Sequence, residues 1–96
     1  MKIRRIVHKG LRRFIEQDDP SGLPPAFVEK IRNILSFLQE MEDVDELLTI
    51  PGWRARRLTG RRKGVWSLTV TRNRRITFRI NEAELEIADL DYEDYH

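Results

Sequence analysis

The chain ends in Asp94-Tyr95-His96, three side chains that can each take part in proton transfer. Histidine has an unperturbed pKa of about 6.5, so His96 can give and take a proton at neutral pH. Cleavage of an RNA strand uses the 2′-OH of the RNA as nucleophile, so the protein only has to move protons and stabilise charge on phosphorus. Arginine, aspartate, tyrosine and histidine would suffice. Taken alone, the tripeptide fits an ordinary polar terminus better than a catalytic site.

Other kinds of chemistry are poorly represented in the composition. The chain has no cysteine, which excludes a thiolate nucleophile, a disulfide framework and Cys-based metal sites. The second histidine, His8, precedes a helix and is interpreted as a capping or surface residue. Since no spacing of histidines offers three zinc ligands, we expect neither a metal nor another cofactor.

Two further groups of residues are assigned structural roles. Trp53 and Trp66 are expected to pack against the core rather than to stack on bases. The carboxylates near the end would alternate between the two faces of an extended chain, so we expect solvated acids rather than a cation site. These carboxylates are Asp89, Asp91, Glu93 and Asp94.

Helical periodicity dominates the first half of the chain. A short strand is expected at 2–7, followed by a helix that carries Leu11 and Phe14 on one side and ends before Pro20. A longer helix is expected over about 25–42, because its apolar residues fall on a single stripe. One further short turn is expected before Pro51-Gly52.

After Gly52 the spacing of the apolar residues changes from one typical of a helix to every second residue. Apolar and polar residues then alternate, which predicts a meander of strands at 53–59, 65–71, 75–80 and 85–90. The predicted fold class is α+β, with two N-terminal helices packed on one face of a small, mostly antiparallel twisted sheet. A chain of 96 residues is expected to form one domain, residues 1–96.

Charge is segregated along the sequence. Residues 50–80 hold ten Lys or Arg and no acid, whereas residues 81–96 hold seven acids and no base. Because helices can cover only one face of the sheet, the other face should carry Arg75 and Arg79, whose planar forks suit phosphate oxygens. The alternative is an acidic tail that folds back and neutralises the basic face. The residues predicted to bind RNA are Arg54, Arg56, Arg61, Arg62, Lys63 and Arg79.

Several short motifs occur together in a fixed order. They are His8-Lys9-Gly10-Leu11, Leu48-Thr49-Ile50-Pro51-Gly52-Trp53-Arg54, Leu58-Thr59-Gly60, Gly64-Val65-Trp66-Ser67, Asn73-Arg74-Arg75-Ile76-Thr77-Phe78-Arg79 and the ending Asp91-Tyr92-Glu93-Asp94-Tyr95-His96. In this order and spacing the chain resembles, over nearly its full length, the HigB branch of the RelE/ParE toxin superfamily.

The resemblance implies a type II toxin that cleaves mRNA in the ribosomal decoding site, without a metal. It also implies neutralisation by a helix-turn-helix, HigA-like antitoxin. By position, Arg75 would hold the scissile phosphate, His96 or Asp94 would transfer protons, and Tyr95 would position or stack on a base. Since no apolar run approaches the roughly 20 residues that span a bilayer, we expect a cytoplasmic protein without a membrane partner.

One position departs from the pattern of the family. Arg56 stands where many relatives have a histidine, and arginine stays charged and cannot accept a proton at cellular pH. Arg56 could instead stabilise charge on the phosphate and leave the proton transfer to His96. The departure keeps other possibilities open: a non-catalytic toxin that inhibits another target, as ParE toxins inhibit DNA gyrase, a plain nucleic-acid-binding module, or a domain that has lost toxicity and only binds its antitoxin.

Overall fold

The computed structural model of the protein describes residues 1–94. Short 3-10 turns connect the main elements, at Pro20–Gly22, Pro25–Phe27, Val44–Thr49, Pro51–Trp53 and Gly60–Arg62. The main elements are β1 (Lys2–Ile3), α1 (Lys9–Gln17), α2 (Val28–Glu40), β2 (Arg56–Arg57), β3 (Val65–Thr71), β4 (Arg74–Asn81) and β5 (Glu86–Asp94).

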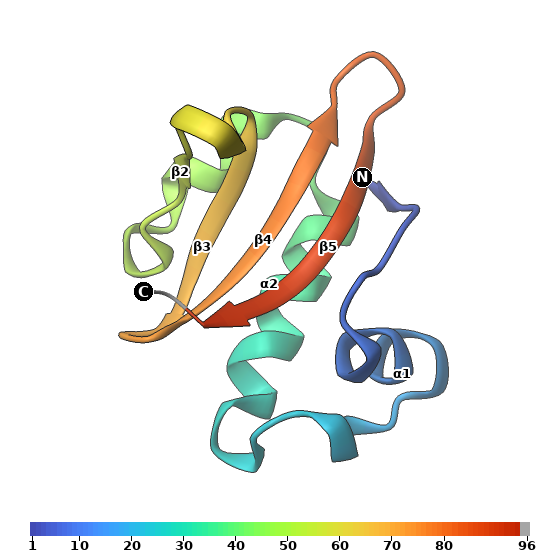
Figure 1. Ribbon diagram of the computed structural model, residues 1–96. Helices are drawn as coiled ribbons and strands as arrows, with labels where there is room; N and C mark the ends of the chain where they lie inside the picture. Colours follow the sequence, from blue (N-terminus) through green and yellow to red (C-terminus); the bar gives the residue numbers. More distant parts are fainter. Residues whose placement is uncertain (95–96) are drawn as a thin grey trace.

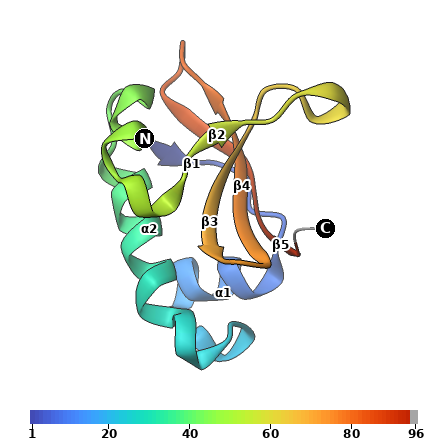
Figure 2. The same ribbon diagram turned by 90° about the vertical axis from the view of Figure 1, so that its left-hand side faces the viewer.

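Within residues 1–94 the strands form one sheet in the order β1-β5-β4-β3-β2. β1 pairs with β5 in parallel, and the other neighbours are antiparallel. In Figure 1 the sheet faces the viewer and α2 crosses behind it, and the quarter turn of Figure 2 separates the helical layer from the sheet. This arrangement confirms the predicted α+β class with helices on one face.

The first helix begins and ends at identifiable residues. The Nδ1 atom of His8 accepts a hydrogen bond from the Leu11 backbone N–H at 3.2 Å, which confirms His8 as a capping residue. Gly10 lies so close to the turn at Gly22 that a Cβ atom there would sit 2.5 Å from the Gly22 carbonyl oxygen. The helix ends at Asp18, which adopts the left-handed conformation with φ 52°.

The core lies between α2 and the sheet. The stripe predicted from the sequence is buried on α2, and it packs against the apolar side of β3, β4 and β5. Trp53 and Trp66 pack against this core, as expected. The fully buried side chains include Ile31, Ile34, Leu38, Leu68, Ile76, Phe78 and Leu90.

The last strand differs from the prediction in length. β5 extends to Asp94, four residues beyond the expected end at Leu90. A register shift in the β4–β5 ladder and a positive φ of 54° at Asp89 mark a bulge. Because the bulge adds a residue between Ile87 and Leu90, the simple alternation of the sequence is interrupted there, although the strand continues.

The strands at the edges are shorter than expected. β1 contains only Lys2 and Ile3, and a single parallel bridge between Ile6 and Leu90 continues the pairing beyond it. β2 contains only Arg56 and Arg57, because the preceding residues through Trp53 form a 3-10 turn. Along residues 1–94, none of the helices combines the length and apolar character that crossing a bilayer requires.

Candidate active site

A pocket of about 220 Å³ opens on the face of the sheet opposite α2. Ser67 of β3 and Thr77 of β4 are paired neighbours and form its floor, with exposed fractions of 4% and 3%. Two residues predicted to be catalytic, Arg75 and Asp94, line the same pocket. The complete lining is Leu58, Arg62, Ser67, Arg75, Thr77, Glu93 and Asp94.

The guanidinium group of Arg75 is held at the turn between β3 and β4. Its Nη1 atom donates to the carbonyl oxygen of Thr71 at 2.7 Å and to that of Arg74 at 3.2 Å. In the sheet Arg75 is paired with Thr69 on one side and Glu93 on the other. Backbone carbonyls therefore help to fix a cation at one end of the pocket.

Asp94 lies at the end of β5, beside the same turn. Its carboxylate forms an ion pair with Arg74, its register partner in β4. Tyr95 and His96, the other two predicted catalytic residues, lie outside the described residues. The structure thus brings together Arg75 and Asp94.

Glu93 lines the pocket, although its position in the sequence predicted only a solvated carboxylate. Its carboxylate accepts hydrogen bonds from both terminal nitrogens of Arg62, at 2.9 and 2.6 Å, and from the hydroxyl group of Thr77. Burial is the largest influence and raises the pKa of Glu93, but the bonds from Arg62 and Thr77 outweigh it and leave the pKa below its ordinary value. Glu93 is therefore charged at neutral pH.

A second pocket, of about 450 Å³, adjoins the first. The two pockets share Leu58 and Arg62, so they are neighbours toward the β2 edge of the sheet. In Figure 2 the loop between β2 and β3 projects from the side of the sheet that faces away from α2. The second pocket is lined by Arg56, Arg57, Leu58, Thr59, Arg61 and Arg62, which include three of the predicted RNA-binding residues.

The other three predicted RNA-binding residues lie outside these two pockets. Arg54 follows the turn at Pro51–Trp53 and adopts the left-handed conformation, with φ 47°. Arg79 donates to the carbonyl oxygen of Lys63 at 3.3 Å, and its Nε atom lies 3.9 Å from Asp89. Arg54 and Lys63 are exposed.

The face of the sheet that carries Arg75 and Arg79 is only partly basic. Because β5 pairs directly with β4, its carboxylates lie beside the arginines of the neighbouring strand and loop. The ion pairs are Arg62 with Glu93, Arg74 with Asp94, and Arg79 with Asp89. The acidic end of the chain therefore neutralises part of the basic face, as in the alternative considered from the sequence, and the positive charge is concentrated toward β2.

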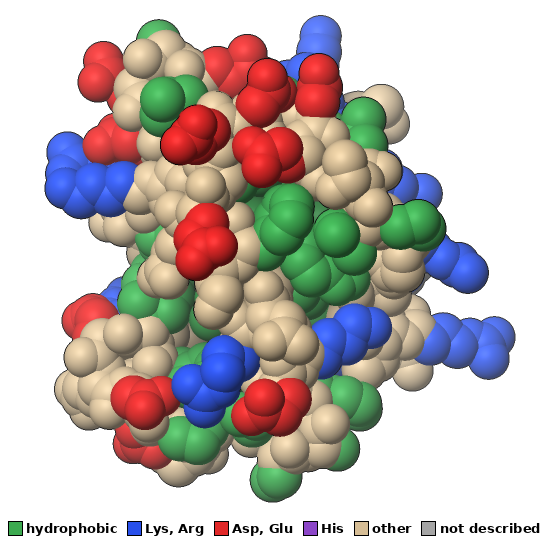
Figure 3. Space-filling view, turned by 180° about the vertical axis from the view of Figure 1, so that it is seen from behind, with side chains coloured by type: hydrophobic (Ala, Val, Ile, Leu, Met, Phe, Trp, Pro, Cys, Tyr) green, Lys and Arg blue, Asp and Glu red, His purple; other side chains and the backbone are tan. Residues whose placement is uncertain are grey.

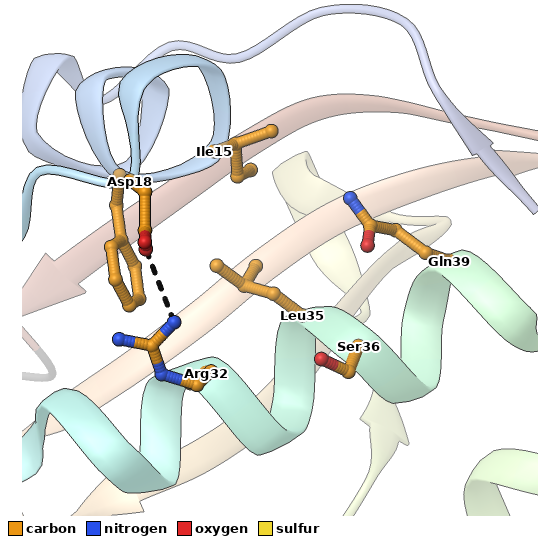
Figure 4. Close-up of a pocket in the computed structure, with 7 residues that line it drawn as sticks. Ile15, Asp18, Arg32, Leu35, Ser36 and Gln39 are labelled. Atoms are coloured by element: carbon orange, nitrogen blue, oxygen red, sulfur yellow. Dashed lines mark hydrogen bonds and ion pairs between the residues drawn. The ribbon is translucent and has the colours of Figure 1, made fainter.

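The helical side of the molecule carries a groove that is separate from these pockets. A groove of about 320 Å³ lies between α1 and α2, and Arg32 and Asp18 form an ion pair across it at 3.2 Å (Figure 4). From this side, acidic side chains gather mainly on the upper half of the surface, and several Lys and Arg side chains project from the edge that carries β2 (Figure 3). None of the predicted site residues lines the groove. Across residues 1–94, no three His, Asp or Glu side chains are grouped as ligands for a metal.

Comparison with known proteins places this geometry in a class. The structure superposes on the YoeB/ParE toxin from Agrobacterium tumefaciens with a TM-score of 0.53 and 19% identity, and the match covers 100% of this chain and 99% of that one. The fold is therefore that of the RelE/ParE toxins, as predicted.

The sequence itself defines the family. Residues 4–96 match the family described as the HigB-like toxin, the RelE-like toxin of the type II toxin-antitoxin system HigB. The protein called endoribonuclease HigB in Proteus vulgaris is 36% identical over 94 residues, which cover 98% of this chain and 99% of that protein. The chain belongs to the HigB-like toxin family of type II toxin-antitoxin systems, and an antitoxin partner follows from this membership.

Proposed function

We propose that this toxin is an endoribonuclease that cleaves translated mRNA on the ribosome through the RNA 2′-OH, without a metal. The observation that carries the proposal is the common pocket of Arg75 and Asp94 on the open face of the sheet. The relative in Proteus vulgaris is named an endoribonuclease, which supports the same activity here.

The chemistry assigns one task to each group. The Arg75 fork binds two oxygens of the scissile phosphate and stabilises the charge that develops there. His96 or Asp94 removes the proton from the 2′-OH or supplies one to the leaving oxygen. Tyr95 positions or stacks on a base. The attacking oxygen belongs to the substrate, so no nucleophile from the protein is needed.

The remaining cations bind the rest of the nucleic acid. Arg54, Arg56, Arg61, Arg62, Lys63 and Arg79 are assigned to phosphates of the mRNA or the ribosome. Each phosphate that they neutralise releases counterions, so raising salt from low to physiological concentration should weaken RNA binding steeply. An RNA affinity that does not change with salt would contradict this assignment.

Expression of the toxin with chosen variants tests the proposal. Induction should arrest growth and produce cuts within translated mRNA that primer extension can map. Arg75→Ala and His96→Ala should each abolish the cuts, whereas Arg32→Ala, which alters an arginine on the helical side, should leave them unchanged. Growth arrest with intact mRNA would sink the proposal, and arrest that also survives His96→Ala would favour a ParE-like toxin that inhibits another target.

Purified components test the finer points. Cleavage should require ribosomes, and the purified toxin should carry no bound metal when it is examined by elemental analysis. We further propose a helix-turn-helix, HigA-like antitoxin and a cytoplasmic location. Co-expression with a gene for such an antitoxin should restore growth, and the two proteins should purify together.

A further inference from the structure

Glu93 connects two parts of the pocket that are distant in sequence. Its carboxylate accepts both terminal nitrogens of Arg62, which lies 31 residues earlier, and the Thr77 hydroxyl below it. We propose that Glu93 is a positioning residue that acts through Arg62 and fixes the basic loop 60–64 beside the catalytic pocket. The inference rests on the proposed function, because it assigns this loop a task in RNA cleavage.

The basic loop has little else to hold it in place. Gly60 and Gly64 adopt positive φ values of 69° and 89° at its two ends, and its residues 60–63 are exposed. Inside the loop the Lys63 N–H donates to the Gly60 carbonyl oxygen at 3.2 Å. In the described part of the chain, side chains link this loop to the strands through the Arg62–Glu93 pair and the 3.3 Å bond from Arg79 to the Lys63 carbonyl oxygen.

Arg62 and Glu93 form a bidentate ion pair, and this pair is the clamp that holds the loop. Two parallel N–H···O bonds between a guanidinium group and a carboxylate restrict orientation as well as distance. Thr77 is 3% exposed, so its hydroxyl orients the Glu93 carboxylate from the buried side. An amide at position 93 would present a single acceptor oxygen and could not bind both nitrogens of Arg62.

The clamp changes the role expected of Arg62. Both terminal nitrogens of Arg62 are bound to a carboxylate, so its main task becomes holding the loop, and phosphate binding falls to the neighbouring Arg61 and Lys63, which form no ion pair within residues 1–94. The competing interpretation is that Glu93 occupies a phosphate position and is displaced by RNA. In that case removal of the carboxylate would strengthen RNA binding.

The two interpretations are separated by measuring loop motion and catalysis in the same variants. Amide hydrogen exchange over residues 58–65 is followed with the cleavage rate and KM for a defined mRNA on ribosomes. Arg62→Ala and Glu93→Gln should each accelerate exchange several-fold and lower the maximal rate about tenfold, with KM little changed. The double variant should be no worse than either single variant, because both remove the same contact.

Two further variants serve as controls. Arg62→Lys keeps the charge but loses the fork, so it should behave like Arg62→Ala if the clamp matters and like wild type if only the charge does. Arg61→Ala should raise KM and reduce the salt dependence of binding without changing exchange.

Several results would overturn the inference: unchanged exchange in Glu93→Gln, tighter RNA binding or faster cleavage by this variant, or additive losses in the double variant. If the wild-type protein cleaves no RNA at all, the proposed function fails and the catalytic part of the inference fails with it. The exchange measurement still decides whether Glu93 anchors the loop, so the two failures can be distinguished.

Discussion

Tyr92 provides a test in which removing a polar group should stabilise the protein. Its ring lies on the core side of β5, the residue is 8% exposed, and its hydroxyl group makes no hydrogen bond to any atom of residues 1–94. A buried hydroxyl without a partner has lost its hydration and gained nothing in exchange. Tyr92→Phe removes this group and keeps the ring.

The expected gain in the free energy of unfolding depends on the contacts that the ring keeps in Tyr92→Phe. The edge-on contact with the ring of His8, at 5.6 Å between centroids, does not involve the hydroxyl. The Arg74 guanidinium carbon lies 5.8 Å from the ring centroid, and this cation–π contact also survives in phenylalanine. An unsatisfied buried hydroxyl costs about 1–3 kcal/mol. After allowing for the small void that the oxygen leaves, we expect the free energy of unfolding to rise by about 1 kcal/mol.

Urea unfolding at pH 7 measures this change directly, and a gain of about 1 kcal/mol corresponds to a rise in Tm of roughly 4–8 °C for a domain of this size. Burial is the main cause that raises the pKa of Tyr92, so ionisation opposes folding. Wild-type stability should therefore fall as pH rises above about 10, the pKa of tyrosine in the unfolded chain, and the advantage of Tyr92→Phe should grow there.

Tyr92→Leu is the matched control, because it removes the ring contacts together with the hydroxyl and should destabilise the protein. A loss of more than about 0.5 kcal/mol in Tyr92→Phe would refute the reasoning. Such a loss would mean that the hydroxyl makes a favourable bond in solution.

Substitutions of Gly10, His8 and Glu93 test the local arguments. Gly10→Ala should cost about 1–3 kcal/mol because its Cβ atom would collide with the Gly22 carbonyl, whereas Gly52→Ala, with no atom within 4 Å of the new Cβ, should change Tm little. His8→Ala should cost about 1 kcal/mol and reduce helicity by circular dichroism, and His8→Asn should retain the cap. Glu93→Gln should lower stability at pH 7 by about 1 kcal/mol. Because the folded pKa of Glu93 is lowered, this difference should vanish as pH falls from about 4 toward 2, and urea titrations across that range measure it.

The helical half of the fold could be predicted because its signals are local. The apolar stripe of α2 and the start of α1 at His8 follow from the spacing of a few neighbouring residues. The alternation in β3 and β4 likewise predicted which side of each strand packs on the helices. The alternation in β4 also placed Arg75 on the face of the sheet that carries the pocket.

The far end of β5 could not be predicted in this way. The bulge at Asp89 breaks the alternation, and its cause is pairing with β4 rather than any local preference. With the strand ended at Leu90, Glu93 seemed to belong to a solvated acidic tail. Leu90 and Tyr92 are both buried, so alternation restarted at Leu90 and continued forward would have placed Glu93 on the pocket side, but this requires knowing that a bulge precedes Leu90.

The position of β5 in the sheet determines when the toxin can acquire its site. This last strand lies between β1 and β4, so the first strand of the chain pairs with the last to be synthesised. Residues 2–3 must remain unpaired until residues 86–87 have emerged, and the wall formed by Glu93 and Asp94 is added later still. A nascent chain that lacks this strand has neither a complete sheet nor a complete pocket. A chain released before residues 86–94 are made would therefore lack both the pairing partner of β1 and the wall of the pocket that Glu93 and Asp94 form.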